Sequence, residues 1–331
     1  GNILDDEDLI NSLEASKVTS FAIEERMVEA EATTKEIFTA REGYRLVATR
    51  ASVLYFVIAS LSNIDPMYQY SLQYFQALYR MRLEKSENSE DLGTRLATLL
   101  DDITLSFFVN ICRGLFESHK LLFAFRISID ILKERGDVTH AEWQSLLVEP
   151  PVIEVSENLP KDSPLYLSSF PFKIFQDLIS LEASFPAFEG LVESCHGLDK
   201  VLWAQFITSK NIGTDDPPAK WGKTLTNIQQ LILLRVIRPD QLVFGIKKFI
   251  GNTLGPIFQS PPGFDLPGCF NDSTSKIPLI FVLSEGADPM DYLLSLALEN
   301  EKKASMRIVS LGQGQGPIAE RHMDSARLNG D

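Results

Sequence analysis

The first place where the sequence could bind a phosphate is the loop Ser284-Glu285-Gly286-Ala287-Asp288-Pro289. An apolar run at 277–283 precedes it and a helical pattern follows, so backbone amides and a positive helix end would face a ligand. A nucleotide-binding P-loop has the pattern GxxxxGK[ST], whose lysine reaches the terminal phosphates. Only Gly286 fits, and Glu285 and Asp288 put carboxylates where the anion would sit. Asp288 before Pro289 is typical of a helix N-cap. We therefore predict a structural role, with nucleotide binding as the alternative.

A second loop, Gly312-Gln313-Gly314-Gln315-Gly316, resembles the phosphate loop of dinucleotide-binding proteins. Its spacing is GxGxG, whereas the fingerprint is GxGxxG. The chain also ends before an acid that binds ribose, about 20 residues later, could be identified. Three glycines between a strand and a helix more often reflect tight backbone packing. We predict that Gly312, Gly314 and Gly316 are structural and that neither loop binds a cofactor, with a dinucleotide site as the alternative.

Histidine and cysteine do not occur with the spacing of a metal site or a catalytic pair. Zinc-binding spacings such as HxxxH, HExxH and CxxC are absent from the sequence, and three cysteines cannot all pair as disulfides. Cys195 and His196 are adjacent, and adjacent side chains rarely point at one another. We predict no catalytic residue and no metal ligand, and a reducing compartment. The residues concerned are His119, His140, His196, His322, Cys112, Cys195 and Cys269.

Composition narrows the classes of partner. The chain has 331 residues, 31 of them basic and 45 acidic, and a formal charge of -14, which repels nucleic acid and anionic lipid headgroups. Hydrophobic residues make up 44%, as in folded soluble proteins. The apolar stretches at 53–61 and 121–125 are shorter than the roughly 20 residues that span a bilayer. The acidic start, without an initiator Met or a signal-peptide pattern, suggests a chain that begins within a longer protein.

The first half of the chain has a helical pattern almost throughout. Apolar residues spaced by three and four run through 10–60, which is typical of a coiled coil. We predict a hairpin with its tip near 32–35, with one long helix as the alternative. Thr139 with Glu142 three residues later predicts a capping box. Further helices are expected at 67–83, 92–117, 119–135 and 139–147. Clustered apolar residues should form the core of a helix bundle, with a partner-binding groove as the alternative: Phe107, Phe108, Leu115, Phe116, Leu121, Leu122, Phe123 and Phe125.

Prolines divide the two halves of the chain at 148–165, a composition that usually joins domains. Helical patterns follow at 172–210 and 225–254. Two strand–loop–helix units are then expected, with strands at 277–283 and 306–311 and helices to 299 and 328. Apolar strands alternating with helices predict a parallel sheet. The predicted fold is therefore a helical N-terminal half, a bundle with a coiled-coil hairpin, followed by an incomplete α/β half.

Several runs along nearly the whole chain resemble the dynein heavy chain family, with an axonemal character. In order they are GNILDDE at 1–7, SK at 16–17, TS at 19–20, SVLYF at 52–56, IDPMYQYSL at 64–72, GLFE at 114–117, LRVIRPD at 234–240, PLIFVLS at 278–284, GADP at 286–289 and SLGQGQGP at 310–317. The resemblance implies the helical small subdomain of the fifth AAA+ module at 1–147, a linker at 148–165 and the truncated large subdomain of the sixth module at 166–331.

In that family the hairpin at 10–60 is similar to the buttress, a coiled coil that supports the stalk leading to the microtubule-binding domain. The resemblance implies that ATP and magnesium act in other modules, and that this segment is not an enzyme. It implies contacts with the stalk and neighbouring modules, indirectly with microtubules, and with intermediate and light chains in the parent complex. The expected location is the cytoskeleton, in a ciliary or flagellar axoneme. A nucleotide-binding α/β protein and a free-standing helical adaptor are the alternatives.

Overall fold

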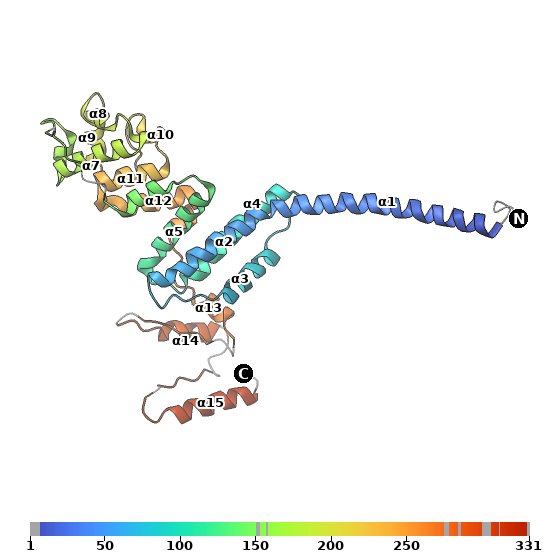
Figure 1. Cartoon of the computed structure of the whole chain (residues 1–331). Coiled ribbons are helices and arrows are strands. Elements are labelled where there is room, and N and C mark those ends of the chain that lie inside the picture. Colours follow the sequence, from blue (N-terminus) through green and yellow to red (C-terminus); the bar gives the residue numbers. More distant parts are fainter. Residues whose placement is uncertain are drawn as a thin grey trace. The chain divides into compact units, whose positions relative to one another are not determined.

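The computed structural model describes residues 7–149, 153–156, 158–274, 278–283, 286–299, 306–310 and 312–329. The chain forms two compact units, residues 1–261 and residues 262–331. In the colours of Figure 1 the first unit runs from blue to orange and the second is orange to red. Each unit is described by itself.

The first unit begins with a helix that the structure does not fold back. Helix α1, Glu7–Gly43, is followed after Tyr44 by α2, Arg45–Ser60, and the backbone bonds run across the joint, from Tyr44 N to Ala40 O at 3.2 Å and from Ala48 N to Tyr44 O at 3.1 Å. The label α1 marks this long extension in Figure 1.

The predicted hairpin is therefore wrong, and the alternative of one long helix is correct. At the expected tip, the hydroxyls of Thr33 and Thr34 donate to the carbonyls of Glu29 and Ala30, at 2.9 and 2.7 Å, inside an unbroken helix. The physical reason is the composition of this stretch, since neither glycine nor proline is present to turn the chain. The three–four spacing predicted a helix here but could not indicate whether a second helix packs against it.

Helices α2 to α6 form the first bundle of this unit, and their buried residues belong to one core that continues into the later helices. After α2 come the short helix η2, Leu61–Asn63, then α3, Leu72–Lys85, α4, Leu92–Cys112, α5, Glu117–Arg135, and α6, His140–Leu147. Helix α2 packs against α4 and α5. The predicted aromatic core is confirmed for Phe107, Phe108 and Phe123, each fully buried, whereas Phe116 and Leu122 are exposed. Helix α3 begins at Leu72, later than predicted, because the Ser71 hydroxyl caps it by accepting from Tyr74 N.

The rest of the first unit consists of short helices. They are η3, Pro164–Leu167, α7, Pro171–Ser184, η4, Pro186–Phe188, α8, Leu191–His196, α9, Lys200–Thr208, α10, Trp221–Thr224, α11, Asn227–Ile237, η5, Pro239–Gln241, α12, Leu242–Leu254, and η6, Pro256–Gln259. The predicted helices at 172–210 and 225–254 are thus interrupted. Pro186 and Pro239 each begin a new short helix, because proline is accepted at a first turn but not inside a helix.

The proline-rich stretch at 148–165 contributes to the packing of the first unit. Leu159, Ser163 and Leu165 are buried, and Ser163 caps η3 through a bond from Leu165 N at 3.1 Å. The predicted division there concerned modules of a parent protein, which the two compact units do not test. It stays a prediction.

The second unit has helices α13, Leu266–Asp272, α14, Met290–Glu299, and α15, Gly316–Asn329. The predicted α/β half is wrong, since no strand is found in the residues that the structure describes, at 278–283 or at 306–310. A strand exists only through hydrogen bonds to a neighbour, and apolar character alone does not provide one. Ile280 and Ile308 are 83% and 65% exposed, so these runs are not the buried strands that the pattern indicated. Residues 277, 284–285 and 311 lie outside the described part.

Candidate functional site

The loop before α14 carries a helix cap in its described part, 286–289. Ser284 and Glu285 lie outside the described residues. The Asp288 carboxylate accepts a hydrogen bond from Met290 N at 2.9 Å, and Pro289 O accepts one from Leu293 N at 3.0 Å. The predicted capping role of Asp288 is confirmed. A carboxylate thus occupies one of the amides that a P-loop would offer to a phosphate.

The glycine loop before α15 is a turn without close neighbours. Gln315 N donates to Gly312 O at 3.1 Å, and Gly314 has a φ of +84°, which glycine adopts without strain. A Cβ built on Gly314 or Gly316 would meet no atom within 4 Å. The predicted tight packing around these glycines is therefore wrong for the part of the chain that is described. The need for glycine is conformational, and it lies at Gly314.

Two of the three cysteines are buried and unreactive in character. Burial raises the pKa of Cys112 and of Cys195 to about 12 in each case, so neither thiol ionises near neutral pH. Cys269 is partly exposed, and none of the three cysteines forms a disulfide. These environments differ from those of catalytic cysteines, whose pKa values are lowered by cations or helix ends.

The histidines are separated in space as well as in sequence. His119 Nδ1 lies 2.7 Å from the Tyr68 hydroxyl, while the ring of His196 stands edge-on to Phe175 with 5.4 Å between centroids. Both ring nitrogens of His196 are buried without a hydrogen-bond partner, and burial lowers its pKa. Among the described residues, no three His, Cys, Asp or Glu side chains gather in a way that could hold a metal ion.

The run IDPMYQYSL at 64–72 is explained by packing, which sequence reasoning did not anticipate. Tyr68 is 2% exposed, and its hydroxyl accepts from Phe116 N at 3.1 Å as well as meeting His119. Asp65 accepts from Met67 N at 2.8 Å and stabilises the turn directly before this tyrosine. The run therefore ties the end of α2 to the corner between α4 and α5. A buried tyrosine needs a hydrogen-bond partner for its hydroxyl, and this requirement could have predicted a polar contact for Tyr68.

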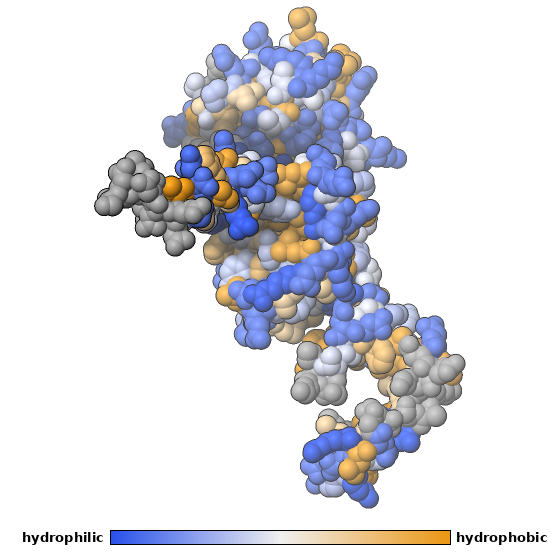
Figure 2. All heavy atoms as spheres, turned by 90° about the vertical axis from the view of Figure 1, so that its right-hand side faces the viewer, coloured by the Kyte–Doolittle hydropathy of each residue, from blue (hydrophilic) through white to orange (hydrophobic). Residues whose placement is uncertain are grey.

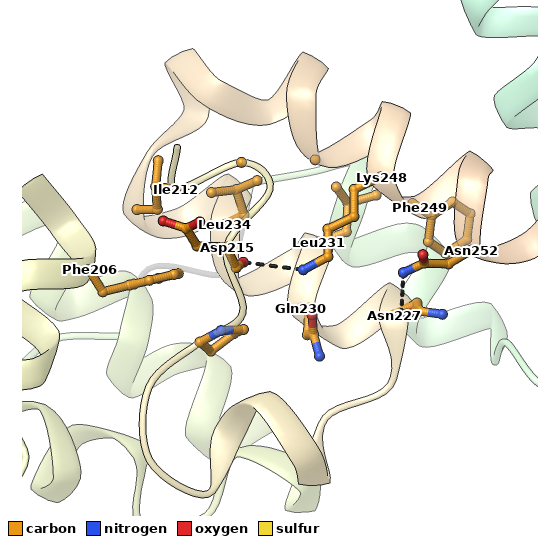
Figure 3. Close-up of a pocket in the computed structure, with 13 residues that line it drawn as sticks. Phe206, Ile212, Asp215, Asn227, Gln230, Leu231, Leu234, Lys248, Phe249 and Asn252 are labelled. Carbon is orange, nitrogen blue, oxygen red and sulfur yellow. Dashed lines mark hydrogen bonds between the residues drawn. The ribbon is translucent and has the colours of Figure 1, made fainter. Parts of the chain in front are cut away.

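A small cavity lies between α11, α12 and the loop before α10 (Figure 3). Lys248 Nζ donates to Asp215 O at 3.2 Å, and Asn252 Nδ2 donates to the Asn227 side chain at 3.2 Å. Its volume of about 30 Å3 suits one or two water molecules. The cavity is too small for a nucleotide or another cofactor, which needs several hundred Å3.

The most unusual surface belongs to α1. From residue 10 onward, its large apolar side chains are substantially exposed: Ile10, Leu13, Val18, Phe21, Ile23, Met27, Val28, Ile37 and Phe38. Some of them line two shallow depressions along the helix, one around Leu13 and Phe21 and one around Met27 and Phe38. Figure 2, which views this helix from its N-terminal end, shows orange and blue side chains next to one another there. Exposed apolar residues in this number mark a contact surface for another element.

One helical stretch, Ile10–Asn63, is long and apolar enough to cross a membrane by length and composition. Its α2 half buries Val47, Leu54 and Val57 in the protein core. Burial in the bundle accounts for the apolar character of these residues without a bilayer. The absence of a membrane partner stays a prediction.

The comparisons with known proteins agree on one family. The family model described as "Dynein heavy chain region D6 P-loop domain" matches residues 274–331, which include both glycine-containing loops. Over all of this chain, dynein axonemal heavy chain 6 and dynein axonemal heavy chain 3 of Homo sapiens are each 38% identical. The Dynein-1-beta heavy chain of the flagellar inner arm I1 complex of Chlamydomonas reinhardtii is 36% identical, also over all of this chain. The chain spans 8%, 8% and 7% of the lengths of these relatives.

Proposed function

We propose that this chain, a segment of an axonemal dynein heavy chain, is a mechanical part of the motor that transmits nucleotide-driven ring movements to the microtubule-binding stalk. One observation carries the proposal: α1 continues without a break into α2, and α2 is anchored by apolar residues buried in a bundle. At a rise of 1.5 Å per residue, α1 extends about 55 Å. A stiff helix with one anchored end is suited to passing a displacement over that distance.

The exposed apolar side chains of α1 support the proposed contact with another helix of the parent chain. Because α1 does not fold back on itself, its spaced apolar residues have no second limb to pack on within the described residues. In this proposal α1 is the buttress-like element and its partner is the stalk coiled coil. The proposal also divides the chain into modules, with 1–147 as the small subdomain of the fifth AAA+ module, 148–165 as a linker and 166–331 as the start of the sixth module.

ATP hydrolysis, in this proposal, takes place elsewhere in the motor. The loop at 284–289 lacks the lysine of a P-loop, and Asp288 caps the following helix with a carboxylate. The alternative of a nucleotide- or dinucleotide-binding α/β protein assumed strands before both loops, and the described residues there contain none. Calorimetric titration of the chain with Mg-ATP should show no binding, and tight magnesium-dependent binding would contradict this step.

The partners proposed for the chain follow from its place in a heavy chain. They are the stalk coiled coil and neighbouring AAA+ modules, then microtubules indirectly, and the intermediate and light chains of the parent complex. The relatives are named as axonemal or flagellar dyneins, and the location is the axoneme of a cilium or flagellum. The formal charge of -14 supports the expectation that nucleic acid is not a partner.

The mechanical role is tested by breaking the helix without shortening it. In the full-length motor, Thr33→Gly with Thr34→Pro should kink α1, because an interior proline removes a backbone bond and clashes with the preceding turn. Microtubule affinity should then no longer depend on the nucleotide state. Deletion of residues 20–45 should have the same effect. The control is Thr33→Ala with Thr34→Ala, since both hydroxyls bond only within α1 and alanine favours helix. Unchanged coupling in the Gly–Pro motor would refute the proposal.

A further inference from the structure

An open cavity of about 730 Å3 lies between the start of α7 and the end of α11. Its volume falls within the range of sites that bind ligands or partner side chains. The inner wall is apolar and fixed, since Ile174, Ile207 and Ile237 are buried. At the mouth, Leu167 and Phe170 are 59% and 71% exposed. An apolar interior with exposed apolar side chains at its entrance favours the insertion of an apolar group.

The charged groups of the wall distinguish between possible occupants. Lys173 Nζ lies 3.4 Å from a Glu149 carboxylate oxygen, and Arg238 forms a two-point pair with Asp240 at 2.8 and 2.7 Å. The remaining cation, Arg235, donates through Nη1 to the carbonyls of Ser145 and Val148 at 2.6 and 2.9 Å. Each cation of the wall therefore already has an acceptor. A phosphate or carboxylate ligand would have to compete with those acceptors, which disfavours an anion.

Asp177 differs from the other charged residues of the cavity. No hydrogen bond or ion pair to its carboxylate is found in the described part of the chain. Burial raises its pKa, Lys173 and Arg235 oppose the increase, and Glu149 adds to it. A half-buried carboxylate without a donor from the protein can accept hydrogen bonds from a bound cation or N–H group. The overall charge of -14 favours a cation further.

We propose that this cavity is a docking site for a peptide segment that inserts one apolar side chain and places an adjacent arginine or lysine against Asp177. A peptide fits better than a small free amine because the mouth, with Leu167 and Phe170, offers apolar surface beyond the cavity itself. Arginine is preferred to lysine, since its planar guanidinium can meet both carboxylate oxygens. The site is independent of the mechanical role of α1, and either can fail without the other.

The test uses the whole chain and two capped dipeptides, acetyl-Leu-Arg-amide and acetyl-Leu-Gln-amide, titrated by ligand-observed NMR. The arginine peptide should bind with a dissociation constant in the millimolar range, and the glutamine peptide about tenfold or more weakly, the usual effect of losing a hydrogen bond between charged groups. Asp177→Asn should weaken binding of the arginine peptide by the same factor and leave binding of the glutamine peptide unchanged. Phe170→Ser should weaken binding of both peptides.

Glu193→Gln is the matched control, because Glu193 is an exposed carboxylate on α8, outside the wall of the cavity, and its loss should change neither titration. Circular dichroism of each variant establishes that the helices persist. Equal binding of the two peptides would overturn the proposal. So would unchanged binding of the arginine peptide to the Asp177→Asn chain, or no detectable binding of either peptide.

Discussion

Replacing Ser194 by alanine removes one oxygen that satisfies two buried indoles. Trp203 Nε1 and Trp221 Nε1 both donate to Ser194 Oγ, at 3.1 and 3.0 Å, and the hydroxyl itself donates to Asp199 at 2.9 Å. The two tryptophans are 0% and 1% exposed. Serine serves this position because its oxygen accepts two bonds while its own hydrogen is donated. The substitution therefore leaves two buried N–H groups without an acceptor.

Each unsatisfied buried donor costs about 1–3 kcal/mol. A water molecule that entered the vacated space would recover part of this cost, so we expect Ser194→Ala to lower the free energy of unfolding by roughly 2–4 kcal/mol. Urea unfolding followed by tryptophan fluorescence measures this loss in the free energy of unfolding, since both indoles report on the site. Their emission should also move to longer wavelength if water enters.

Ser184→Ala is the control for the loss of a hydroxyl. Its Oγ donates only to Ser180 O, at 2.7 Å, and the residue is exposed on α7. We expect a change within about 0.5 kcal/mol, as at most surface positions. If Ser194→Ala unfolds at the same urea concentration as Ser184→Ala, the buried indoles do not depend on this oxygen and the reasoning fails.

Two further changes test packing and protonation. Gly245→Ala puts a Cβ 2.4 Å from Leu234 Cδ2 where α12 crosses α11, so we expect a loss of about 1–3 kcal/mol in urea unfolding, while Gly93→Ala, with 3.4 Å to its nearest neighbour, should change little. His196 has a pKa lowered by burial, so the unfolded chain binds its proton first as pH falls below about 6.5. The free energy of unfolding should therefore decrease from pH 7 down to the native pKa of this group. His196→Phe should flatten that part of the pH profile, and an unaltered slope would count against a neutral buried imidazole.

Local chemistry could be predicted from sequence where a few neighbouring residues determine the outcome. Thr139 and Glu142 form the predicted capping box, with Glu142 N donating to Thr139 Oγ1 at 3.2 Å and Thr139 N donating to the Glu142 carboxylate at 2.9 Å. Asp288 is equally local, and its capping bond to Met290 is present. Both patterns act within three residues, so no knowledge of distant packing was needed.

Features that depend on distant partners could not be predicted in the same way. The spacing from Leu13 to Ile37 could not indicate whether a second helix packs there, and the predicted hairpin is a single helix. The apolar run at 278–283 has the composition of a buried strand, yet pairing requires a neighbour at hydrogen-bonding distance. Likewise, the cavity beside Asp177 arises from the meeting of α7 and α11 and has no motif in the sequence.

The proposed mechanical role requires that α1 be attached to a body that moves as a whole, and one pair of contacts bears on this requirement. Helices α6 and α11 each begin with a capping box, and the two boxes are joined because Gln229 Nε2 donates to the buried Glu142 carboxylate at 2.8 Å. Each of these two side chains thus caps its own helix and binds the other. Slippage of α6 along α11 would break this bond and disturb both caps, each worth about 1 kcal/mol. The helices on either side of the proline-rich stretch are therefore coupled by contacts that resist sliding, and a displacement received at α1 would pass into both.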